Sequence, residues 1–149
     1  MAVQTKDLEM DNTDIFHLLH TMQIFTNHAA IKWTKAFNQE IGISPLIVLS
    51  KLKHHGRLKQ SELANKLGLT PGAITNIADK LIKKSYVVRE FNTDDRRVVY
   101  LVITDEGRKI LDKAIEASNE IQLEIFQAIS KSEQKQLLQI YQKLIAQFT

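Results

Sequence analysis

The sequence contains no cysteine among its 149 residues. Disulfide bonds, thiol nucleophiles, cysteine-rich zinc sites and peroxide-sensing thiols are therefore excluded. Nothing in the composition requires an oxidising compartment. The sequence also lacks a nucleophile elbow, a phosphate-binding loop and a paired-carboxylate motif. No feature supports an enzyme, and we expect no cofactor.

Long apolar runs are missing as well. No stretch approaches the roughly 20 apolar residues that a membrane span needs. Residues 1–12 are mixed and acidic, without the apolar centre of a targeting segment. There is no internal repeat, low-complexity tract or linker, and 44% of the residues are hydrophobic, enough to fill a core. We therefore expect a cytoplasmic protein that forms a single domain over residues 1–149, with no membrane partner.

Positive charge is concentrated in the middle of the chain. The formal net charge of +3 is a weak pointer to polyanions when it is spread over the whole sequence, because solubility alone can explain it. Residues 51–97, however, contain 11 Lys or Arg against 5 Asp or Glu, so the rest of the chain is negative. A nucleic-acid partner would be expected to bind this middle third.

Helical periodicity dominates both ends of the chain. Apolar residues at three- and four-residue spacing predict a long amphipathic helix over residues 15–37. Ser44 followed by Pro45 predicts the capped start of a short buried helix, and Thr104 and Ser130 are capping residues for two later helices. The last helix carries one apolar stripe: Leu137, Leu138, Tyr141, Leu144, Ile145 and Phe148.

Between these ends, two helices are predicted over residues 60–67 and 71–84, joined by only three residues. Ala64 is small enough to let the helices approach, and Gly68 can adopt the left-handed conformation that ends the first one. Ile74 and Ile77 pack the second helix back against the first. This arrangement is a helix-turn-helix, whose second helix is the recognition helix.

The outer face of the recognition helix is the candidate DNA-binding surface. Ile74, Ala78 and Leu81 face inward by their spacing. Asn76 could hydrogen-bond an adenine edge, and Lys80 could neutralise a phosphate. A helical hairpin that simply packs is the alternative for this stretch taken alone. The candidate contact residues are Thr70, Gly72, Ala73, Thr75, Asn76, Lys80 and Lys83.

A β-hairpin follows the recognition helix directly. Two β-rich runs, residues 86–91 and 98–103, flank a polar tip that contains Arg96 and Arg97. Arginine suits the narrow, negative minor groove of A·T-rich DNA, and Asp95 can brace an arginine and order the tip. A solvated turn is the alternative for the tip alone. A helix-turn-helix followed by such a wing is more specific than either part, because the wing adds a second contact surface.

These elements, in this order, resemble the MarR family of bacterial and archaeal regulators over nearly the whole chain. The most diagnostic part is the Asp-Arg-Arg wing followed by a strand that ends in Thr-x-x-Gly. The stretches that carry the resemblance are residues 58–64, 70–75, 95–97 and 101–107.

The resemblance implies a mainly α fold with a small β-wing and a triangular homodimer. Residues 1–40 and 105–149 would form dimerisation helices, and residues 44–104 a winged helix-turn-helix that binds double-stranded DNA. Each recognition helix would enter a major groove and each wing the flanking minor groove, with Arg97 inserted more deeply than Arg96. The implied function is a sequence-specific transcriptional regulator, a repressor at a pseudo-palindromic operator that a small molecule releases.

Two positions depart from the family's usual pattern. Lys59 stands where a capping Ser or Thr is common, and Ser85 stands where a glycine usually ends the recognition helix. A left-handed conformation costs a non-glycine residue roughly 1 kcal/mol, so at Ser85 the helix end could be held differently and the wing angle could change.

Members of the family commonly bind a small, often aromatic or phenolic, effector between the dimer helices and the winged part. The candidate lining residues here are His17, His20, Trp33 and Phe37, although apolar residues at helical spacing usually belong to a core or an interface. His17 and His20 lie one turn apart, but a dedicated metal site needs further ligands that the sequence does not supply, so we expect no metal.

One further class remains open, a winged-helix module that binds protein without specific DNA binding. Such a module would be expected to have an acidic or apolar outer face on its recognition helix. The basic middle third argues against it.

Overall fold

The computed structural model describes residues 12–37 and 41–148 of the chain. It is mainly helical with one small sheet, which confirms the expected fold class. The elements are α1 (Asn12–Phe37), α2 (Ile43–His55), β1 (Arg57–Leu58), α3 (Gln60–Leu67), α4 (Pro71–Lys83), β2 (Val87–Phe91), β3 (Val99–Ile103), α5 (Asp105–Phe126), α6 (Lys131–Ile145) and a short 3-10 helix, η1 (Ala146–Phe148).

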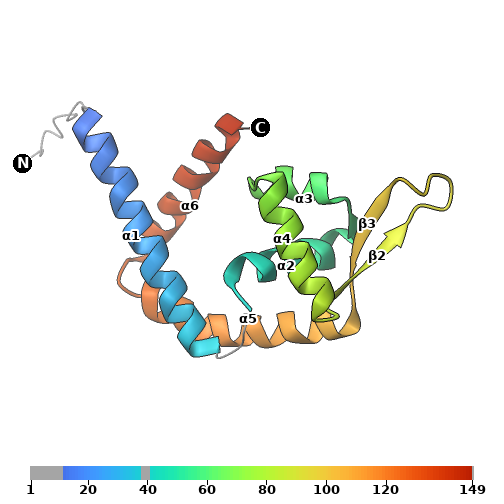
Figure 1. The fold of residues 1–149 in the computed structure, drawn as a ribbon. Coiled ribbons are helices and arrows are strands. Elements are labelled where there is room, and N and C mark those ends of the chain that lie inside the picture. The colour runs from blue at the N-terminus through green and yellow to red at the C-terminus, as the bar shows by residue number, and fades with distance from the viewer. Residues whose placement is uncertain (1–11, 38–40, 149) are drawn as a thin grey trace, which may run out of the picture.

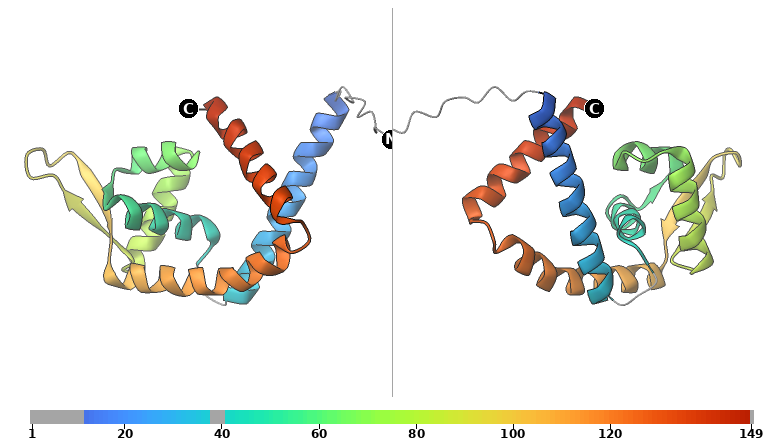
Figure 2. Two further views of the ribbon diagram at one scale, coloured as in Figure 1. Left: turned by 180° about the vertical axis from the view of Figure 1, so that it is seen from behind. Right: turned by 60° about the vertical axis from the view of Figure 1, so that its left-hand side comes forward.

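Helix α5 joins two differently built ends of the molecule (Figure 1). At one end α2, α3, α4 and the sheet pack together on the first turns of α5. At the other end α1 and α6 rise from the far part of α5, and both views of Figure 2 show them standing apart from α3, α4 and the wing. None of the described helices is both long and apolar enough to cross a membrane.

The hydrophobic core lies in the winged end. Its fully buried side chains come from α2, α3, α4 and the sheet, and α5 closes it with Ile110, Leu111 and Ala114. No residue of α6 is buried. Large apolar side chains are instead exposed along α1, α6 and η1, among them Phe16, Leu19, Phe25, Leu138, Leu144, Ile145 and Phe148.

The sheet is antiparallel with strand order β1-β3-β2. The wing strands β2 and β3 pair over five residues, from Val87 opposite Ile103 to Phe91 opposite Val99. Their bounds agree with the predicted hairpin to within one residue at each end. Strand β1, which pairs with β3 through Arg57 and Leu58, was not expected from the sequence.

The two helices of the helix-turn-helix begin and end largely as predicted. Gly68 has φ 63° and ends α3 in the left-handed conformation. Thr70 caps α4, because its Oγ1 accepts the Ala73 N–H at 3.2 Å. Ile74 and Leu81 are fully buried beneath α4, so the inward face of the recognition helix is the predicted one.

The start of α2 corrects the sequence-based prediction. The helix begins at Ile43, its N-cap is Gly42 in an extended conformation, and Ser44 lies inside the first turn without capping it. Pro45 is tolerated there because the N–H groups of a first turn have no partners within the helix. The Ser-Pro pair thus marks the beginning of the helix without supplying its cap.

Ser85 takes the left-handed conformation that is usual for glycine, with φ 61°. Its N–H donates to the Ile82 carbonyl and the Tyr86 N–H donates to the Leu81 carbonyl, both at 2.9 Å. This is the hydrogen-bond pattern with which glycine-ended helices close. The departure at Ser85 has therefore not changed how α4 ends.

The end of α4, the wing and the start of α5 meet at one joint. Thr104 Oγ1 donates to the Ser85 carbonyl at 2.6 Å and accepts the Gly107 N–H at 3.0 Å, which also caps α5. The Thr104 N–H donates to the Tyr86 carbonyl at 3.0 Å. The backbone of Gly107 packs so closely on Tyr86 that a Cβ would collide with the Tyr86 carbonyl. The joint holds the recognition helix and the wing in a fixed relation to α5.

Candidate nucleic-acid interface

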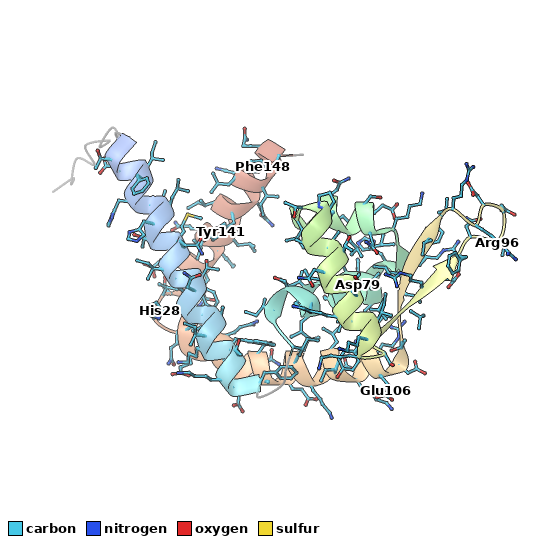
Figure 3. All side chains as sticks on the ribbon, viewed as in Figure 1. His28, Asp79, Arg96, Glu106, Tyr141 and Phe148 are labelled. Carbon is cyan, nitrogen blue, oxygen red and sulfur yellow. The ribbon has the colours of Figure 1, made fainter. Side chains whose placement is uncertain are left out.

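The recognition helix α4 presents a polar face to solvent beside the wing (Figure 3). Among the candidate contacts, Ala73 is partly buried. The others are exposed and lie on α4 or at its N-cap: Thr70, Gly72, Thr75, Asn76, Lys80 and Lys83.

Two of these candidates already use their hydroxyl groups within the protein. Thr70 Oγ1 accepts the Ala73 N–H, as described above. Thr75 Oγ1 donates to the Pro71 carbonyl at 2.9 Å and accepts from Gln60 Nε2 at 3.1 Å. Since a hydroxyl has a single proton, Thr75 can offer DNA an acceptor but no donor while these bonds persist. The same bonds tie the start of α3 to the outer face of α4.

An ion pair that the sequence did not reveal joins α4 to the wing. Arg89 Nη2 on β2 donates to Asp79 Oδ1 on α4 at 2.8 Å, and both side chains are substantially exposed. Figure 3 shows Asp79 on α4 and Arg96 at the end of the wing beside it. An exposed pair of this kind contributes only ~0.2–1 kcal/mol. Its effect is to join the middle of β2 to the recognition helix and to neutralise the Asp79 carboxylate.

The wing tip is ordered by its own side chains. Asn92 Oδ1 accepts the N–H groups of Asp94 and Asp95, at 2.8 and 3.2 Å. The Asp95 carboxylate then receives the backbone N–H, Nε and Nη2 of Arg97, at 3.0, 3.1 and 3.2 Å. These contacts, chiefly from the Arg97 side chain, hold the pKa of Asp95 below its usual value. Arg97 is thereby oriented while its side chain remains 91% exposed, and Arg96 is exposed beside it.

A second cationic group lies where β1 meets the wing strands, beside the Glu90–Tyr100 pair. Arg57 Nη1 of β1 donates to Glu90 Oε1 of β2 at 3.0 Å, and its guanidinium carbon lies 4.5 Å from the centroid of the Tyr100 ring. Lys59 Nζ lies 5.9 Å from the same centroid. These contacts depend on the register of the three-stranded sheet and could not be read from sequence spacing.

The four candidate effector residues do not form one site. Trp33 lines a groove of about 380 Å³ between α1, α2 and α5, together with Leu46, Ile47, Leu111 and other residues. Phe37 is buried in the core, with its ring centroid 5.0 Å from that of Trp33.

His17 and His20 are exposed near the N-terminal end of α1, about four helical turns before Trp33. Within the described residues, no three His, Cys, Asp or Glu side chains are placed to hold a metal ion.

Comparison with known proteins gives a consistent family. The model of the MarR family matches residues 44–99. The transcriptional repressor MdtR of Bacillus subtilis is 37% identical over 105 residues, which make up 69% of this chain and 68% of MdtR.

Solved structures share the fold. A mutant of MarR from Escherichia coli in complex with operator DNA has a TM-score of 0.80 at 20% identity, covering 91% of this chain and 99% of that one. The organohalide-sensing regulator RdhR, bound to 2,4-dichlorophenol, has a TM-score of 0.80 at 16% identity, covering 97% and 88%.

Proposed function

The chain belongs to the MarR family of transcriptional regulators, which are DNA-binding proteins and not enzymes. On that premise we propose that it binds a pseudo-palindromic DNA operator as a homodimer and represses the neighbouring genes until a small aromatic or phenolic effector releases it. A regulator of this kind works where its DNA is, which we take to be the cytoplasm.

The observation that supports this proposal is that two exposed surfaces, the free face of α4 and the wing tip, belong to one packed unit. Asn76, Lys80 and Lys83 project from the free face of α4. Arg97 projects from a wing tip that Asp95 has already ordered. Such a unit can place a helix in a major groove and an arginine in the adjoining minor groove with little loss of side-chain freedom. We assign base reading to Asn76 and phosphate contacts to the lysines.

We propose that a second copy of the chain covers α1 and α6. Their apolar residues are exposed in the single chain, and contiguous apolar surface of this kind is costly to leave in water. Residues 1–40 and 105–149 would then serve dimerisation, and residues 44–104 DNA binding, within one domain. Two-fold symmetry would place the two half-sites about 10 bp apart on one face of the duplex.

The groove beside Trp33 is our candidate for the effector. It is lined mainly by apolar side chains and lies where α1 and α5 meet α2 of the winged end. An aromatic molecule bound there would touch both ends of the chain and could shift one relative to the other. RdhR was solved with a chlorinated phenol, which agrees with this choice of ligand class.

The experiment that tests the function compares two duplexes of equal length, one carrying the DNA that flanks the chain's own coding sequence and one of random sequence. Affinity for each is measured at about 50 and 200 mM salt. We expect the flanking DNA to be preferred at both concentrations. Equal binding that salt abolishes would contradict sequence-specific regulation and would favour the protein-binding module instead.

A further inference from the structure

Lys59 occupies a position that helix physics disfavours. It is the N-cap of α3, where a stabilising residue accepts a hydrogen bond from a first-turn N–H, and a lysine ammonium can only donate. Its charge also lies at the positive end of the helix dipole. Only the reverse half of a capping box is present, in which Glu62 Oε2 accepts the Lys59 N–H at 2.7 Å. A serine would stabilise α3 better, so the lysine calls for another explanation.

The ammonium of Lys59 lies beside the Tyr100 ring of wing strand β3, and no carboxylate in the described part of the chain pairs with it. Its Nζ lies 5.9 Å from the centroid of the Tyr100 ring, against which the Arg57 guanidinium also packs. Glu90, which faces Tyr100 across the strands, pairs with Arg57. Among the ion pairs of the described residues none involves Lys59. The charge of Arg57 is thus neutralised by protein, and that of Lys59 is left for an outside partner.

Lys59 lies between the two parts of the proposed DNA surface. The next residue, Gln60, donates from Nε2 to Thr75 on the outer face of α4. On the other side, Tyr100 belongs to wing strand β3. In a helix-turn-helix bound to DNA the first helix crosses the sugar-phosphate backbone. The start of α3 therefore faces the backbone that separates the groove entered by α4 from the groove reached by the wing.

From this arrangement we infer that Lys59 binds a DNA backbone phosphate between those two grooves, with the Tyr100 ring as its support. The inference rests on the proposed DNA-binding function and adds a contact that neither the recognition helix nor the wing tip provides. A lysine ammonium is a compact point charge suited to a phosphate. On this account Lys59 stabilises α3 less than a capping residue would, but it adds a contact to DNA.

The test is Lys59→Ser in the full chain, with affinity for random duplex DNA measured over a range of salt concentrations. The logarithm of the DNA-binding constant K falls linearly with the logarithm of the salt concentration. Each lost phosphate contact should make this negative slope (the salt slope) less steep by about one unit per bound protomer. The melting temperature of the free protein should rise by about 2–4 °C, because serine supplies the missing cap. Weaker DNA binding together with a more stable protein is not expected of a residue whose role is structural.

Three further variants separate the outcomes. Lys59→Arg should keep the parental slope, and Lys59→Gln should lower it without supplying a good cap. Lys109→Ser removes the same charge from α5 next to Glu106, far from the wing tip in Figure 3, and should leave the slope unchanged.

If Lys59→Ser and Lys59→Gln keep the parental slope while Arg97→Ala lowers it, the inference about Lys59 is wrong and the proposed function stands. If the parental protein binds no duplex even at low salt, the proposed function itself fails.

Discussion

The Arg97 side chain is both exposed to solvent and held in one orientation, and both properties bear on how its removal should change DNA binding. Asp95 holds the guanidinium in place without burying it. We expect Arg97→Ala to weaken DNA binding and to lower the salt slope by about one unit per protomer. Arg97→Lys should restore the slope, but it should not restore the preference for A·T-rich flanks, which depends on a guanidinium in a narrow groove. Titration of both variants with A·T-rich and G·C-rich duplexes would measure this, and an unchanged affinity for Arg97→Ala would remove Arg97 from the interface.

Ser85 pays a conformational cost that a glycine would avoid. Its φ of 61° lies in the left-handed region, which costs a residue with a Cβ roughly 1 kcal/mol. The contact with Thr104 uses the Ser85 carbonyl, which any residue supplies. We therefore expect Ser85→Gly to raise the melting temperature by about 2–4 °C, while Ser85→Ala leaves it nearly unchanged. If thermal denaturation shows Ser85→Gly to be the less stable protein, the serine side chain must stabilise the helix end by a contact of its own.

At the scale of elements, the joint around Gly107 determines how the wing meets α5. A Cβ at this position would collide with the Tyr86 carbonyl and lie 2.8 Å from Ile103 Cγ1. Backbone cannot rotate away as a side chain can, so Gly107→Ala should push α5 off the wing and cost about 1–3 kcal/mol. We expect a lower melting temperature, and weaker operator binding even well below that temperature.

Gly72→Ala, where a Cβ meets nothing within 4 Å, is the matched control for stability. If Gly107→Ala melts at the same temperature as the parental protein, the contact between Gly107 and Tyr86 does not fix the wing to α5.

The elements that the sequence predicted well are those with a repeating pattern or a distinctive end. The 3.6-residue spacing and the Gly68 and Thr70 caps located α3 and α4, and the change to β-rich runs located the wing. The faces of α4 followed from the same periodicity. Periodicity states which face of a helix is apolar but not which neighbour covers it. For that reason the sequence could not separate Trp33, which lines a groove, from Phe37, which is buried in the core.

What the sequence could not supply depends on register and on backbone conformation. Strand β1 is two residues long, too short to show any alternation. The Asp79–Arg89 pair depends on how α4 packs beside β2, and the Tyr100 cluster depends on how strands β1, β2 and β3 align. Ser44 had the chemistry of a cap, yet the chain enters α2 one residue before it. The contacts that fix the wing to the recognition helix were therefore visible only in the structure.

At the scale of the whole molecule, helix α5 packs against both the winged end and the end formed by α1 and α6. Its first turns pack under the winged core, and its last turns carry α1, through the edge-to-face pair of Phe25 and Phe126 among other contacts. The groove beside Trp33 lies between these two regions of α5. If a second copy fixes α1 and α6, we expect a ligand that widens this groove to alter the angle between the dimer base and the recognition helix. An effector could in this way change the spacing of the two recognition helices without touching DNA.

The proposed dimer can be tested on α6, because the apolar side chains of this helix pack only weakly against the rest of the single chain. Leu138 and Leu144 are 59% and 48% exposed, and no residue of the helix is buried. The double substitution Leu138→Glu and Leu144→Glu should leave the winged core folded but make the protein monomeric, because burying uncompensated carboxylates between two copies is strongly unfavourable. Operator affinity should then fall steeply, because the two half-sites would no longer be bound as one unit.

Sedimentation equilibrium gives the mass of each protein, with Gln136→Glu, which adds charge outside the apolar stripe, as the control. We expect the parental chain and the control to sediment as dimers and the double variant as a folded monomer. A double variant that remains dimeric and keeps its operator affinity would show that α6 does not form the interface, and the link between the groove and the spacing of the recognition helices would then have to run through α1 alone.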